Sequence, residues 1–387
     1  LAVQAFTVFL FATRPLATYT LSLKILGSRG KAVLVAVFVA LHASFFEVWG
    51  WGGYPNLLGF ALLPLALYFA VDAFEGRGVG RLSLAAAFTL LTVPTHLLTG
   101  VVLAATMLVW FFIYGVWWMS LRRQSSEGVL RFGLFCTLLS AALLGYGWFA
   151  MSTGWFEANP AALANRIGLD DFLYAFHGFR NYLSIVFAVV AFPCLFASFR
   201  RAIKSAENGV VLRYSLLLSW VLAPLALTQV MVFGVSADPA RFVFFLIQPF
   251  AVAVADHVNL DSASPLRKKF GNLRATSMLI LLISASAMSV PASFEVTKWY
   301  HLNLPPREDA GLLEAIEWMR SRTQDGDVVV SSQYLGEWVS GLADWKVLQT
   351  YPLRFAFSRG EVERSLDAET ILSSSYTLSS YDFQVVE

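Results

Sequence analysis

Long apolar runs alternate with short polar connections over the first three quarters of the chain. A helix needs about 20 apolar residues to cross the hydrocarbon core of a bilayer. Runs of this kind, some of them short, predict ten membrane segments at about 1–23, 31–46, 55–73, 82–94, 98–118, 129–151, 181–199, 211–232, 239–258 and 273–291. The pattern therefore predicts a polytopic α-helical membrane protein.

Three of these segments contain features that disfavour a simple span. In "TVPTHLLTG", Pro94 and Gly100 would break a helix, which predicts a hairpin near one surface. Arg14 lies inside the first apolar run, where a charge is costly. One alternative is that the first span ends there and that residues 15–28 form an interfacial helix.

Lysine and arginine are concentrated in alternate connections. Three basic residues, Arg166, Arg180 and Arg241, belong to one set of connections. Sixteen belong to the other set: Lys24, Arg29, Lys31, Arg77, Arg81, Arg122, Arg123, Arg131, Arg200, Arg201, Lys204, Arg213, Arg267, Lys268, Lys269 and Arg274. The positive-inside rule assigns the richer set to the cytoplasm. The outer connections are then 47–55, 94–98, 152–180 and 233–240, together with the region after Pro291.

The character of the chain changes at about residue 292, where charged residues become frequent. "EDAGLLEAIEWMRSRT" has helical spacing, "VVVSS" reads as a strand, and "GEVERSLDAETILSS" reads as a helix. This alternation predicts an extracytoplasmic α/β domain at 292–387 with a mainly parallel sheet, after a membrane region at 1–291. The first apolar run begins at Leu1, so we expect a fragment of a longer protein, with both regions incomplete.

Composition narrows the functional classes. The chain is 57% hydrophobic and only 14% charged, whereas soluble domains have about 25% charged residues. A net charge of +2, without a basic cluster on one element, argues against a nucleic-acid partner. No P-loop, HExxH or GxSxG motif occurs. The lipid bilayer is thus the partner that composition itself predicts.

The connection "FFEVWGWGGYPNLLGF" places one carboxylate among aromatic and glycine residues on the predicted outer face. Trp49, Trp51 and Tyr54 fit the aromatic belt of a membrane interface, and Glu47 could simply end a helix. The glycines permit a tight bend and a close approach to a ligand, which favours a substrate site. Both interpretations remain open.

Other polar residues of the predicted outer face are candidates for binding. His96 either ends a helix in a hydrogen bond or binds substrate. Asp170 and Asp171 either cap a loop helix or bind an acceptor or a divalent cation such as Mg²⁺ or Mn²⁺. His177 could complete such a metal site, although the spacing matches no specific motif, and Arg180 follows in the same loop.

Arg241 in "SADPARFVFFLIQPF" begins a span from the side that has few basic residues. A guanidinium there suits a phosphate at headgroup depth, because it presents a planar fork of donors and keeps its charge. The alternative is an arginine that snorkels to the interface or pairs with Asp238.

"WGGYPNLLGFALLPLAL" and "LLTVPTHLLTGVVL" resemble the membrane core of GT-C-type glycosyltransferases, particularly archaeal and bacterial membrane proteins related to 6-pyruvoyl-tetrahydropterin synthase. The tail "AIEWMRSRTQDGDVVVSSQYLGEWVSGLADWKVLQTYP" resembles the external domain of that group and, more distantly, that of oligosaccharyltransferase catalytic subunits. This tail has "SSQYLGEW" at the place where oligosaccharyltransferase catalytic subunits carry a Trp-Trp-Asp signature.

This resemblance implies an inverting transfer of a sugar from a polyprenyl-phosphate donor to an acceptor, on the outer face of the plasma membrane of a prokaryote, and it favours an archaeon. It also implies a catalytic acid in a loop that precedes Leu1, so we expect the fragment alone to be inactive. The available carboxylates, Glu47, Asp170 and Asp171, would contact the acceptor or a metal, and Arg241 would bind the phosphate. The aromatic residues, His96 and Arg180 would line the substrate site. A lipid or solute transporter and a non-catalytic scaffold with an external binding domain are the alternatives.

Overall fold

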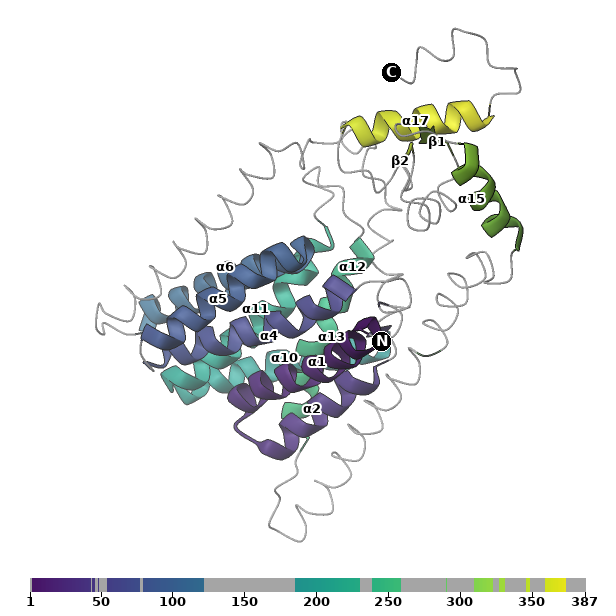
Figure 1. The fold of residues 1–387 in the computed structure, drawn as a ribbon. Coiled ribbons are helices and arrows are strands. Elements are labelled where there is room, and N and C mark those ends of the chain that lie inside the picture. The colour runs from purple at the N-terminus through teal and green to yellow at the C-terminus, as the bar shows by residue number, and fades with distance from the viewer. Residues whose placement is uncertain are drawn as a thin grey trace. The chain divides into compact units, whose positions relative to one another are not determined.

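The computed structural model describes residues 2–42, 44–45, 48, 54–76, 79–121, 185–229, 239–258, 290, 310–322, 327–330, 346–348 and 359–373. The chain divides into two compact units. The first comprises residues 1–146, 169–229 and 239–297, and the second comprises 147–168, 230–238 and 298–387. Figure 1 shows the described helices of the first unit as a bundle.

The described helices of the bundle are α1 (Ala2–Leu26), α2 (Arg29–Leu41), α4 (Tyr54–Phe74), α5 (Val79–Thr95), α6 (Leu97–Leu121), α10 (Ile185–Ser205), α11 (Asn208–Leu227), α12 (Pro239–Val243), the 3₁₀ turn η3 (Phe244–Leu246) and α13 (Ile247–Asp256). Among them, α4, α6, α10 and α11 are long and apolar enough to cross a membrane. The chain is thus mostly helical where it is described, with the composition of an integral membrane protein.

Helices form where the apolar runs predicted them. The helices α4, α5, α6, α10 and α11 each contain most of one predicted segment. The predicted segment at 129–151, and 273–291 apart from Val290, lie outside the described residues. The full number of ten spans therefore stays a prediction.

The first helix does not end at Arg14, so the interfacial helix considered for residues 15–28 is wrong. Helix α1 runs from Ala2 to Leu26 with Pro15 inside it. The Arg14 side chain is fully buried, donates from Nη2 to the Val39 carbonyl oxygen at 2.9 Å, and lies 3.7 Å from the centre of the Phe45 ring. Protein atoms rather than lipid surround this charge, and the helix can therefore continue past it.

The hairpin predicted from "TVPTHLLTG" is formed by α5 and α6, with His96 between them. Pro94 lies in the last turn of α5, and Gly100 lies in the first turn of α6. A Cβ atom on Gly100 would lie 3.2 Å from the Cα atom of Val93. The missing side chain thus lets the two helices approach closely beside the turn.

The segment α12–η3–α13 is the most buried part of the bundle. Every residue from Phe242 to Asp256 is buried, and α13 contacts α1, α2, α10 and α11. A helix that is apolar on all sides is expected to lie inside a bundle. Pro249 has no N–H to bond to the Phe245 carbonyl, which accounts for the 3₁₀ turn at this point.

The second unit contains α15 (Ala310–Arg322), β1 (Val328–Val329), β2 (Lys346–Val347) and α17 (Arg359–Ser373). The two strands pair in parallel, with Val328 opposite Lys346 and Val329 opposite Val347. The helices at 310–322 and 359–373 and the strand at "VV" fall where the sequence predicted them. The larger α/β domain with a mainly parallel sheet stays a prediction.

Candidate functional site

Two groups of ion pairs lie at one end of the bundle, which we call the charged end. It includes the turn between α1 and α2, the end of α4, the start of α5, the turn between α10 and α11, and the end of α13. The junction of α5 and α6 and the starts of α4 and α12 lie at the opposite end.

The first group of ion pairs joins α1, α4, α5 and α11. Lys24 forms ion pairs with Asp72 and, at 2.6 Å, with Glu75. Arg81 Nε lies 3.6 Å from Asp72 Oδ2, and Arg213 Nε lies 3.5 Å from Glu75 Oε1. The Asp72 side chain is fully buried, and removal of one partner from such a pair is strongly destabilising. We assign this group a role in holding the four helices together.

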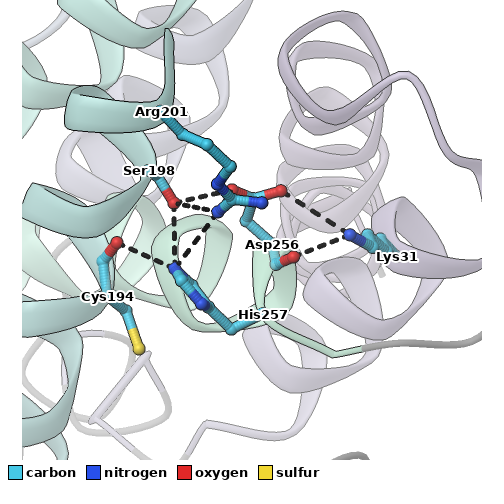
Figure 2. A network of polar contacts seen from close by, with 6 residues as sticks. All are labelled: Lys31, Cys194, Ser198, Arg201, Asp256 and His257. Carbon is cyan, nitrogen blue, oxygen red and sulfur yellow. Dashed lines mark hydrogen bonds and ion pairs between the residues drawn. The ribbon is translucent and has the colours of Figure 1, made fainter. Parts of the chain in front are cut away.

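The second group of polar contacts centres on Asp256, the last residue of α13 (Figure 2). Its Oδ2 accepts hydrogen bonds from Ser198 Oγ at 2.6 Å and from Arg201 Nη2 at 3.0 Å. Lys31 donates to the Asp256 backbone oxygen at 2.7 Å and lies 3.6 Å from Oδ1. The carboxylate thereby ties α13 to α10 and to α2.

Serine, histidine and aspartate meet in this group, but their geometry is not that of a nucleophilic triad. His257 Nε2 lies 2.9 Å from the Cys194 backbone oxygen, which can only accept, so this nitrogen carries a proton. It therefore cannot take a proton from Ser198 Oγ, 3.1 Å away. Asp256 bonds directly to the serine, whereas in a triad it would orient the histidine. We assign this group a role in holding α13 against α10 and α2.

The opposite end holds the three candidate residues that the structure describes. Tyr54 begins α4, His96 joins α5 to α6, and Arg241 lies in α12. The other candidates lie outside the described residues: Glu47, Trp49, Trp51, Asp170, Asp171, His177 and Arg180. The structure therefore brings Tyr54, His96 and Arg241 to one end of the bundle.

His96 caps the first turn of α6. Its Nδ1 accepts a hydrogen bond from the Thr99 backbone N–H at 3.3 Å and lies 2.8 Å from Thr99 Oγ1. Burial and then the positive charge of Arg241 lower the pKa of His96 to about 4. The imidazole is thus neutral at physiological pH, with Nδ1 as an acceptor and Nε2 free to donate. This geometry matches the helix-end alternative for His96, and the lowered pKa favours the neutral imidazole.

Arg241 is exposed, and its charge acts on His96. Among the described residues of the bundle, it is the only cation at this end. The basic residues of α1, α2, α5, α10 and α11 other than Arg14 gather at the charged end instead. Arg241 is therefore the described residue best placed to meet an anion here.

Three polar side chains inside the bundle were overlooked or misread in the sequence. Gln248 donates from Nε2 to Thr18 Oγ1 at 2.9 Å and to the Phe60 carbonyl at 3.0 Å, which links α13 to α1 and α4. Arg14 Nε and Nη1, and both ring nitrogens of His42, have no hydrogen-bond partner among the described residues. An isolated polar residue in an apolar run is the sequence feature that could have revealed Gln248 and His42.

A comparison with models of known protein families and with curated proteins found no match. Within the described ranges, no three metal-binding side chains of His, Cys, Asp or Glu gather in one place. The predicted metal ligands Asp170, Asp171 and His177 are not among those residues.

Proposed function

We propose that the chain is the membrane part of a glycosyltransferase that transfers a sugar from a polyprenyl-phosphate donor to an acceptor on the non-cytoplasmic face. In this proposal the charged end faces the cytoplasm of a prokaryote, and the opposite end faces outward. The membrane region has ten segments, and residues 292–387 belong to an extracytoplasmic α/β domain. The resemblance to GT-C-type enzymes is the source of the reaction class.

The observation that supports the proposal best is the position of Arg241. It is exposed at the end of the bundle where the described residues include no other cation, and His96 lies within range of its charge. The positive-inside rule accounts for cations at the charged end but not for this one. A guanidinium at headgroup depth is suited to bind the phosphate of a lipid-linked donor.

The proposed reaction requires two kinds of group. A carboxylate takes the proton from the acceptor hydroxyl. The oxygen of that hydroxyl attacks the anomeric carbon of the sugar and forms the new bond. The bond from that carbon to the lipid phosphate breaks, and the electron pair leaves with the phosphate. Arg241 would stabilise the charge that develops there. Glu47, Asp170 and Asp171 are the proposed carboxylates, with Mg²⁺ or Mn²⁺ as a possible partner.

The experiment uses the full-length protein in membranes with undecaprenyl-phosphate carrying a radiolabelled hexose. We expect Arg241→Ala to lower transfer at least about tenfold, because a hydrogen bond to a charged group contributes about 1.5–3 kcal/mol. Arg241→Lys should retain part of the activity, and Glu47→Gln should abolish transfer. Arg29→Ala is the matched control, since Arg29 is an exposed cation at the charged end. Wild-type transfer by Arg241→Ala would refute the assignment.

One observation favours a second function, the transport of a lipid or solute. Arg14 is fully buried near the middle of α1, and the described residues place no carboxylate against it. Charges inside a bundle often mark the path of a transported ion or substrate. Transport of a fluorescent anionic lipid across proteoliposomes, lost in Arg14→Gln and accompanied by no sugar transfer, would favour this alternative.

A further inference from the structure

One face of α10 changes from apolar to cationic along its length. Ile185, Val189 and Phe196 are 50%, 62% and 53% exposed, and Arg200 and Lys204 are also exposed. Their spacing of four, seven, four and four residues places all five on the same side of the helix. The face therefore presents an apolar surface that ends in two positive charges at the charged end.

An open cavity of about 500 Å³, more a surface depression than an enclosed pocket, lies at the cationic part of this face. The described residues that line it are Phe196, Ala197, Arg200, Arg201 and Lys204. Three of these five side chains are cations, and Phe196 contributes an aromatic wall. The lining thus combines positive charge with apolar surface.

The positive charge of the cavity is only partly neutralised. Arg201 uses Nη2 to bond Asp256 (Figure 2). Its side chain remains 58% exposed. The carboxylate of Asp256 also forms an ion pair with Lys31. Arg200 and Lys204 form no ion pair with any residue that the structure describes. Among the described residues, one carboxylate therefore faces an excess of cations, which favours an anionic occupant.

The position of the cavity along α10 indicates which kind of anion binds there. Nineteen residues separate Ile185 from Lys204, a distance of about 29 Å at the helical rise. This nearly equals the hydrocarbon thickness of a bilayer, about 30 Å. If Ile185 lies at one boundary of the hydrocarbon, Lys204 lies at the other boundary beside the lipid phosphates, and Arg200 lies one helical turn before it, from where its long side chain extends to the same phosphates.

We propose that this cavity binds the phosphate of an anionic phospholipid, whose acyl chains lie along the exposed apolar face of α10. Arg200 and Lys204 bind the phosphate oxygens, and Phe196 contacts the first part of an acyl chain. Arg201 connects the headgroup to Asp256, so a bound lipid also supports the contact between α10 and α13. This site lies at the charged end and is independent of the donor site proposed at the opposite end.

Native mass spectrometry of the full chain tests this site, with equal amounts of phosphatidylglycerol and phosphatidylcholine added in detergent. We expect the first bound lipid to be phosphatidylglycerol. Arg200→Gln and Lys204→Gln should each weaken it about fivefold, since a cation near an anionic lipid surface contributes about 1 kcal/mol. Arg29→Gln removes an exposed cation at the same end that does not line the cavity, and it should change the affinity little.

Three results would overturn the proposal. Equal binding of the two lipids would show that the headgroup charge is not recognised. An equal loss in Arg29→Gln would show diffuse attraction without a defined site. Displacement of the bound lipid by millimolar inorganic phosphate would show that the cavity recognises free phosphate. Circular dichroism of each variant establishes that the helices are retained.

Discussion

Asp256→Asn tests whether the group of contacts in Figure 2 holds the bundle together. The substitution keeps the size of the side chain but removes its charge. Ser198 can still donate to the amide oxygen, but the bond becomes one between neutral groups. Lys31 keeps its bond to the backbone oxygen at 2.7 Å and loses its ion pair, while Arg201 loses a charged acceptor at 3.0 Å.

The expected cost follows from the burial of each partner. Breaking a buried ion pair costs about 3–5 kcal/mol. The Asp256 and Lys31 side chains are only 5% and 17% exposed, so their ion pair is close to a buried one. Arg201 is 58% exposed, so solvent screening limits its share to about 1 kcal/mol or less. Because the asparagine retains part of the hydrogen bonding, we expect the free energy of unfolding to fall by about 2–3 kcal/mol.

Unfolding in mixed detergent micelles, followed by circular dichroism, measures this change. Glu207→Gln is the matched control, because Glu207 is an exposed carboxylate at the same end without a side-chain capping bond. It should change the free energy of unfolding by about 0.5 kcal/mol or less. Ser198→Ala should cost about 1–2 kcal/mol and, combined with Asp256→Asn, less than the sum of the two. Equal effects of Asp256→Asn and Glu207→Gln would refute the role of the network.

Three further predictions follow from the bundle. Gly59→Ala should lower the free energy of unfolding by about 1–3 kcal/mol, because its Cβ would overlap the Thr99 side chain. Gly115→Ala, where nothing lies within 4 Å, should raise it by about 0.5–1 kcal/mol, and equal thermal shifts would contradict this contrast. Burial and a nearby guanidinium lower the pKa of His96 to about 4, so the unfolded chain alone binds this proton between about pH 4 and 6.5. The free energy of unfolding should therefore fall as the pH is lowered through this window, and it should fall less steeply in His96→Asn. Unfolding curves at a series of pH values measure this dependence. The same slope in the original protein and in His96→Asn would contradict the prediction. Arg14→Met should leave the free energy of unfolding within about 1 kcal/mol of the original or raise it, because a buried charge with two unbonded nitrogens is removed; a loss above about 2 kcal/mol would argue against this.

The helices were predictable because each depends on a local pattern. A run of about 20 apolar residues must satisfy its own backbone hydrogen bonds in a membrane, and a helix does so without help from distant residues. The break at His96 was also predictable, since Pro94 and Gly100 disfavour a continuous helix. Arg14 was misread because a charge in an apolar run predicts the end of a span only when lipid surrounds it.

The candidate site was predictable only in part. The alternation of basic connections placed Tyr54, His96 and Arg241 on one face, and the structure has them at one end of the bundle. The cap formed by His96 depends on a contact with Thr99, only three residues away, so the local sequence could predict it. The effect of Arg241 on His96 spans a much longer separation along the chain, so no local pattern could have revealed it.

The amino-acid sequence alone determined the membrane character, most helix positions and the division of basic residues between two sets of connections. It did so because hydrophobicity and helix formation act over neighbouring residues. Only the tertiary structure decided the partners of Asp72, Glu75 and Asp256, and the burial of Arg14 and Gln248. Five of the sixteen basic residues that predicted the orientation form ion pairs with these acids: Lys24, Lys31, Arg81, Arg201 and Arg213. Such pairs form between helices distant in sequence, since low dielectric inside the bundle makes an unpaired charge costly wherever its partner lies along the chain.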